Sequence, residues 1–163
     1  MGHKIKEDKL MNELFESSHK EFKVRELSKQ TRIPKSTLQR YLVKLQKKKI
    51  IDRKNKLIIN SYTKLLKSFN FIKKLYEVGL IDYLEQKLKP SAIIIFGSVR
   101  KGEYTKESDI DIFIEAINKR EVIVSQFEKK LKHKIQLFIE SDINNLPDEL
   151  YNNVINGIKV SGY

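Results

Sequence analysis

An apolar run, a Gly-Ser pair and two closely spaced aspartates constrain the fold more than any other part of the chain. Residues 92–96 are apolar, Gly97 and Ser98 interrupt them, and Asp109 and Asp111 follow after ten intervening residues. This order predicts a strand, a tight turn, a polar loop and a second strand. Side chains alternate along a strand, so the aspartates share one face with Cα atoms roughly 6.5–7 Å apart. Two such carboxylates repel each other unless a cation lies between them, and their oxygens suit Mg²⁺.

The same stretch resembles the nucleotidyltransferase superfamily related to DNA polymerase beta, and within it the minimal nucleotidyltransferase domains. The match consists of G-S at Gly97, a spacer of about ten residues, and D-I-D-I from Asp109, with R-K-G-E from Arg100 similar to the usual loop. It covers roughly residues 80–160. Taken separately, D-I-D favours a solvated strand end and G-S an ordinary turn, whereas the two together in this register favour the family fold.

The resemblance implies a site that holds an NTP and a divalent cation. In the family, backbone N–H groups of the Gly-Ser turn approach the triphosphate, and the two carboxylates hold Mg²⁺ or Mn²⁺. Asp109 and Asp111 are therefore the candidate catalytic residues and metal ligands. The candidate nucleotide-binding residues are Gly97, Ser98, Arg100 and Lys101, of which Arg100 and Lys101 are also compatible with a solvated loop.

A third acidic position departs from the family pattern. The family usually has a string like K-V-D-L in its third strand, whereas residues 134–137 are K-I-Q-L, which places Gln136 at the acidic position. An amide oxygen can coordinate a cation but cannot accept a proton. Glu140 shares the strand face but lies some 13 Å further on, at ~3.3 Å per residue. Two alternatives remain: transfer with two carboxylates, or a retained fold that binds nucleotide without efficient transfer.

Charge is distributed unevenly along the chain. The net charge is +12, and residues 1–68 hold 19 Lys and Arg against 7 Asp and Glu, while residues 69–163 hold 14 of each. A basic first half predicts a polyanionic partner. The alternative is a Lys-rich surface without such a partner, although that bias should extend along the whole chain.

The first half resembles a winged helix-turn-helix domain. Apolar periodicity predicts helices over residues 4–18, 22–30 and 35–48, followed by two short strands, 50–53 and 56–59, around a basic turn. The resemblance implies binding of double-stranded DNA, with the third helix in the major groove. A helical domain with an ordinary charged face, or one that binds proteins, is the alternative. The candidate DNA-binding residues are Lys35, Ser36, Gln39, Arg40, Lys44, Arg53, Lys54 and Lys56.

Residues 61–78 predict a helix with Ser61 as its N-cap and an apolar stripe at Leu65, Leu66, Phe69, Ile72, Leu75 and Tyr76. This stripe must be buried, either by docking one domain on the other or by pairing with a second copy. The second option favours a homodimer, because helix-turn-helix proteins usually bind two half-sites.

The rest of the chain predicts a short α/β domain. We expect helices over residues 81–88 and 118–132, with Ile123 inward, a strand over 134–140, a mostly helical stretch over 143–156 and a final strand over 158–160. The fold class is thus α+β: a winged helix-turn-helix (1–62), a helical connector (63–79), and a minimal nucleotidyltransferase-like domain with a short mixed sheet (80–163).

Two functions follow from these features. The first is a DNA-binding enzyme that transfers NMP from Mg-NTP to a hydroxyl of a partner protein or a small molecule. The second is a DNA-binding transcriptional regulator of antitoxin type, whose nucleotidyltransferase-like domain only binds nucleotide or mediates assembly. Because the chain has no cysteine, no long apolar run and no apolar leader, we expect a cytoplasmic protein without a membrane partner. His3, His19 and His133 have no ligand spacing, and we expect them at the surface.

Overall fold

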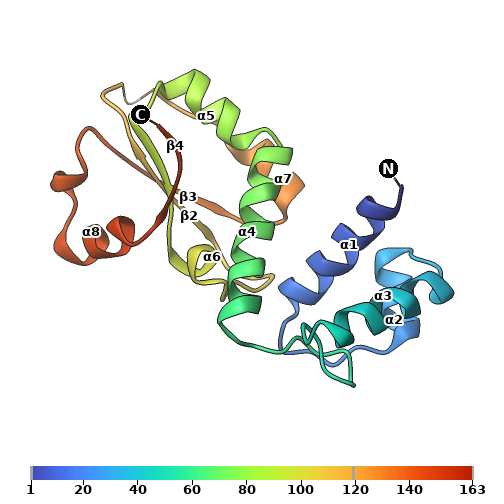
Figure 1. Cartoon of the computed structure of the whole chain (residues 1–163). Helices are drawn as coiled ribbons and strands as arrows, with labels where there is room; N and C mark the ends of the chain where they lie inside the picture. The colour runs from blue at the N-terminus through green and yellow to red at the C-terminus, as the bar shows by residue number, and fades with distance from the viewer. Residues whose placement is uncertain (1, 119, 163) are drawn as a thin grey trace. The chain divides into compact units, whose positions relative to one another are not determined.

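The computed structural model describes residues 2–118 and 120–162, with side chains from residue 6 onward. The chain divides into two compact units, one comprising residues up to Lys64 and the other residues from Leu65 onward (Figure 1). Among the described residues, no helix combines the length and the apolar character needed to span a membrane.

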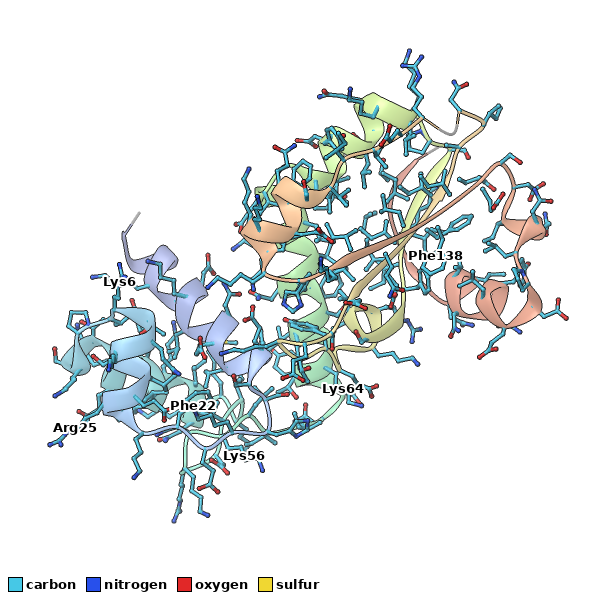
Figure 2. The ribbon with its side chains drawn as sticks, turned by 180° about the vertical axis from the view of Figure 1, so that it is seen from behind. Lys6, Phe22, Arg25, Lys56, Lys64 and Phe138 are labelled. Atoms are coloured by element: carbon cyan, nitrogen blue, oxygen red, sulfur yellow. The ribbon has the colours of Figure 1, made fainter. Side chains whose placement is uncertain are left out.

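The first unit is built from three helices: α1 (Gly2–Glu16), α2 (Val24–Thr31) and α3 (Lys35–Lys47). Leucines at i, i+4 and i+7 of α3 are buried, which is the spacing of a single helix face. Phe22, which precedes α2, is also buried in this unit (Figure 2). The remaining apolar core of the unit includes Leu10, Leu14, Phe15, Leu27, Ile33, Ile50, Ile51 and Leu57.

The two strands expected at 50–53 and 56–59 are reduced to one antiparallel bridge between Ile51 and Leu57. Asp52 explains this difference, because its Oδ1 accepts hydrogen bonds from the backbone N–H groups of Lys54 (2.8 Å) and Lys56 (2.9 Å). Asn55 then donates from Nδ2 to the carbonyl of Phe22 at 3.0 Å. Side chains that bind local backbone groups compete in this way with strand pairing.

Helix α4 comprises Ser61–Glu77. Its N-cap is Asn60 and not Ser61 as expected. Asn60 Oδ1 accepts a hydrogen bond from Thr63 N at 2.9 Å, and Thr63 Oγ1 accepts one from Asn60 N at 3.0 Å. This reciprocal pair satisfies two backbone donors that the first turn leaves without helical partners.

The second unit contains a mixed sheet, which confirms the expected short mixed sheet. Within the described residues four strands follow the order β3-β2-β1-β4. Strand β1 pairs antiparallel with β2 and β4, whereas β2 and β3 are parallel. The elements are α5 (Leu80–Leu88), β1 (Ala92–Ile95), α6 (Gly97–Lys101), β2 (Ile110–Glu115), α7 (Ser125–Leu131), β3 (Ile135–Glu140), a 3-10 turn (Ile143–Asn145), α8 (Asp148–Ile155) and β4 (Ile158–Gly162).

Helices cover both faces of this sheet. Figure 1 shows α8 on one side and α5 and α7 on the other. Towards α8, Phe96, Phe113 and Val154 form a buried cluster against which Phe138 packs (Figure 2). The alternate residues of β2, Ile110, Ile112 and Ile114, are fully buried on the opposite face. Strand β2 is thus apolar on both faces between Asp111 near its start and Glu115 at its end, and Asp109 directly precedes the strand.

The helix expected over residues 118–132 is confirmed only in its second half. Helix α7 begins only at Ser125, and Ile123, expected inward, is 64% exposed. Residues 122–124 are Val-Ile-Val, and such β-branched residues lose side-chain freedom in a helix. The backbone N–H of Ile123 instead donates a hydrogen bond to the hydroxyl oxygen of Tyr83 at 3.1 Å. Residue 119 lies outside the described residues.

Candidate active site

The two aspartates lie at the beginning of β2. Asp109 directly precedes the strand and Asp111 is its second residue. In the parallel pairing with β3, Asp111 lies opposite Gln136, and Asp111 shares its strand face with Phe113. Both aspartates are half-buried. The site is therefore at the edge of the face that α8 covers, where the apolar cluster ends.

The electrostatics of this pair disfavour two negative charges. Burial raises the pKa of the Asp111 carboxyl, and the neighbouring charge of Asp109 raises it further. Negative charge thus accumulates in a partly desolvated position. A bound cation would offset both causes.

Gly97 allows the chain to pass directly over Asp111. Its φ is +65°, in the left-handed region that favours glycine, and an added Cβ would lie 2.0 Å from Asp111 Oδ2. The preceding residue, Phe96, donates its backbone N–H to the carbonyl of Asp111 at 3.2 Å. Gly97 is therefore required by both the backbone conformation and the close approach of the carboxylate.

The backbone on both sides of Asp109 is bound by the segment that precedes β3. The Ser108 carbonyl accepts a hydrogen bond from His133 Nδ1–H at 2.8 Å, a carbonyl oxygen being able only to accept. Ile110 N donates to the Lys134 carbonyl at 2.9 Å. His133 was expected at the surface, yet it is only 6% exposed.

His133 is held by aromatic neighbours. Its ring lies edge-on to Phe71 of α4 at 5.1 Å between centroids, and Tyr104 lies at 6.3 Å. Phe71 and Tyr104 in turn pack at 4.6 Å. This buried cluster fixes the carbonyl before Asp109. It brings together α4, the loop before β2 and the loop before β3, which no local sequence pattern connects.

Gln136 contacts the site directly. Its Nε2 donates to Asp109 Oδ2 at 2.9 Å, so the amide satisfies one carboxylate oxygen where the family pattern has an acid. Glu140 pairs with Glu115 at the far end of β2, which agrees with the expectation that it lies too far away to substitute.

The expected nucleotide-binding residues lie on one short turn. Gly97 and Ser98 begin α6, and Arg100 and Lys101 are exposed in its last turn. The turn closes on itself, because Glu103 N donates to the Ser98 carbonyl at 2.9 Å. The structure thus brings Gly97 against Asp111 and places both basic side chains in solvent at the same end of the sheet.

The side chains present at the site fit a divalent cation, which the family usually binds. The carboxylates of Asp109 and Asp111 form a hard-oxygen donor set of the kind that holds Mg²⁺ together with substrate phosphates. The pKa of Asp111 is raised, and a bound cation would offset the cause. In the described part of the chain, no three or more His, Asp or Glu residues gather into a metal cluster. Water and phosphate oxygens would complete the coordination.

The expected DNA-binding residues all belong to the first unit. Ser36, Gln39 and Arg40 line a hollow of about 370 Å³ on the exposed face of α3, together with Val43. Lys44 Nζ lies 3.0 Å from Glu7 Oε1, and Lys54 Nζ lies 3.0 Å from Glu21 Oε1. The side chains of Lys35 and Arg53 are exposed, while that of Lys56 is half-buried.

A mixed sheet with Gly-Ser after its first strand and two carboxylates at the start of its second defines a nucleotidyltransferase-type domain. The profile of the family described as "Nucleotidyltransferase domain" matches residues 78–161. The chain belongs to this family. A protein of Methanocaldococcus jannaschii named "Putative protein adenylyltransferase" is 35% identical over 69 residues, which cover 38% of this chain and 69% of the relative. No solved structure matches the chain significantly.

Proposed function

We propose that the second unit transfers a nucleoside monophosphate from Mg-NTP to a hydroxyl group of a partner protein. The observation that supports this most directly is the close approach of Gly97 to Asp111, since a scaffold has no need to press a left-handed glycine onto a half-buried carboxylate. The similarity to a protein named as a putative protein adenylyltransferase favours ATP and a protein acceptor.

In this proposal each group has one role. Backbone N–H groups at the start of α6 approach the triphosphate, and the exposed Arg100 and Lys101 neutralise its charge. Asp109 and Asp111 hold the cation, which supplies charge neutralisation of the phosphates when bound. Gln136 and His133 keep Asp109 in position through its carboxylate and the preceding carbonyl.

The test is calorimetric titration of ATP into the full chain with and without Mg²⁺. Saturable binding that requires Mg²⁺ supports the proposal, and transfer of labelled AMP to co-purified protein would follow. Absence of binding in both conditions would leave the alternative of a regulator with a nucleotidyltransferase-like scaffold.

Gln136→Asp is expected to strengthen the cation site and weaken the cation-free fold. The substitution restores a carboxylate opposite Asp111 but removes the hydrogen bond to Asp109 and adds like charge. We expect the Mg²⁺ concentration needed for half-maximal ATP binding to fall by about tenfold, the lower end of the range for residues that tune a metal site. The melting temperature without Mg²⁺ should fall. Gln126→Asp, an exposed change of the same type on α7, is the control and should alter neither quantity.

We further propose that the first unit binds double-stranded DNA as part of a homodimer, with α3 as the recognition helix of a winged helix-turn-helix. The hollow on α3 is lined by Ser36, Gln39 and Arg40, whose groups bond phosphates and base edges. Residues 1–68 also carry the whole net charge of the chain. Sedimentation equilibrium would measure the oligomeric state, and a monomer at all concentrations would count against the dimer.

DNA affinity is expected to depend steeply on salt. The logarithm of the affinity should fall linearly with the logarithm of the salt concentration, with a slope of about −0.9 per phosphate contacted. Lys54→Glu with Lys56→Glu should weaken binding uniformly across sequences, whereas Gln39→Ala or Arg40→Ala should change sequence preference. Fluorescence anisotropy with labelled duplexes measures both effects, and Lys87→Glu on α5 is the control. Binding that does not respond to salt would refute the proposal.

A further inference from the structure

A hollow of about 540 Å³ opens beside Asp109. Gly97 follows β1, which pairs with one side of β2, whereas the hollow lies between α7, the loop before β2 and the residues that precede β3, the strand on the other side of β2. Asp109 lines the hollow, and Asp111, which Gly97 approaches, does not. The lining residues are Lys106, Glu107, Ser108, Asp109, Ser125, Glu128, Lys129, Lys132, His133 and Lys134.

The charges of the hollow are ordered from its rim to its floor. Its four lysines and Glu107 are exposed, while Asp109 and Glu128 are half-buried and His133 is buried. Glu128 Oε1 already accepts a hydrogen bond from Ile135 N at 3.0 Å, so its charge is fixed in place. The rim is thus mostly cationic and the floor carries carboxylates.

This arrangement of charges disfavours a phosphate group at the floor of the hollow and favours a neutral hydroxyl. A phosphate group at the floor would face the charges of Asp109 and Glu128, which disfavours the triphosphate or a nucleic-acid backbone there. A neutral hydroxyl at the floor meets no such repulsion, and acidic groups on either side of it would lie against the lysines of the rim. The volume is that of a pocket for one side chain and its neighbours, not for a duplex.

We propose that this hollow receives the acceptor, a hydroxyl-bearing side chain within an acidic segment of a partner protein; this rests on the proposed nucleotidyl transfer. The hydroxyl oxygen forms a bond to the α-phosphorus, the bond from that phosphorus to the α,β-bridging oxygen breaks, and pyrophosphate leaves on the Gly-Ser side. The hydroxyl proton passes to water at the open mouth of the hollow. An acceptor on the side opposite the leaving group satisfies the in-line geometry of phosphoryl transfer.

The test uses fluorescein-labelled seven-residue peptides with a central Ser, Thr or Tyr flanked by Glu, and matched peptides flanked by Gln. Binding to the full chain is measured by fluorescence anisotropy at low ionic strength. The variant is Lys129→Glu with Lys134→Glu, two exposed rim residues. The control is Lys87→Glu with Lys130→Glu, which has the same change in charge on exposed residues outside the hollow.

We expect the Glu-flanked peptides to bind at least tenfold more tightly than the Gln-flanked ones, and the rim variant, but not the control, to lose that preference. Equal loss in both variants, or equal binding of both peptide sets, overturns the inference. An oligonucleotide of equal charge that binds more tightly, and depends on the same rim lysines, also overturns it. ATP binding by the wild type is measured in the same buffer: its absence refutes the proposed function, whereas ATP binding without peptide preference refutes only the acceptor site.

Discussion

Replacing Asp109 or Asp111 by alanine is expected to abolish Mg²⁺-dependent ATP binding and to lower AMP transfer by at least about 10²–10³-fold, the size of effect seen when one preorganised electrostatic group is removed. Both carboxylates belong to the same half-buried donor set at the start of β2, and Gln136 cannot replace either charge. Calorimetry measures the binding, and transfer of labelled AMP measures the activity. Asp82→Ala, an exposed aspartate on α5, is the control and should retain both.

Removing the charge of Asp111 should raise the stability of the fold although it removes ATP binding. Burial and the charge of Asp109 raise the pKa of Asp111, so the fold favours its protonated form. The stability contributed by this group is fully present below its unfolded pKa of about 3.9 and is lost as the pH rises through the raised folded value. Asp111→Asn should therefore melt at a higher temperature than the wild type at pH 7 without Mg²⁺, with the difference shrinking as the pH falls. A purely structural aspartate would instead lose stability with function.

Local order along the chain was sufficient to predict the strands of the second unit, the Gly-Ser turn and the position of both aspartates at the start of β2, but not the absence of the two strands expected at 50–53 and 56–59. Each of these features depends on neighbouring residues, and period-two alternation places Asp109 and Asp111 on one face. The hydrogen bond from Gln136 to Asp109 depends on the register between β2 and β3, which a single sequence does not reveal. The burial of His133 likewise depends on Phe71 and Tyr104, which are distant in sequence.

The apolar stripe of α4 shows why periodicity alone misassigns a helix face. Ile72 and Leu75 are buried as expected, but Leu65 and Phe69 are 50% and 55% exposed, and Phe71, outside the predicted stripe, is buried. Lys67 is buried in their place, with its Nζ 4.5 Å from the centroid of the Tyr104 ring. A cation over an aromatic ring is stabilised by an attraction that a hydropathy pattern does not include. The buried face of α4 therefore contains Lys67, a residue that the pattern treats as polar.

Gly97→Ala is expected to remove ATP binding through a residue that has no side chain of its own. The alanine would need a left-handed backbone at φ +65°, which costs roughly 1–2 kcal/mol. Its Cβ would also lie 2.0 Å from Asp111 Oδ2, so either the carboxylate or the turn must move. Displacement of Asp111 should weaken Mg-ATP binding by at least about 10²-fold, comparable to losing a preorganised charged group.

Gly79→Ala separates the effect of backbone strain from the effect of the contact with Asp111. Gly79 has a similar left-handed φ of +79°, but an added Cβ would have no neighbour within 4 Å. The same backbone strain should lower the stability of this variant, with a fall in melting temperature of roughly 4–8 °C per kcal/mol for a domain of about 100 residues. Its ATP affinity should stay within about twofold of the wild type. If both variants lost stability equally and both still bound Mg-ATP, the contact between Gly97 and Asp111 would have no part in the site. Loss of ATP binding confined to Gly97→Ala would show that the turn acts by holding the carboxylate in place.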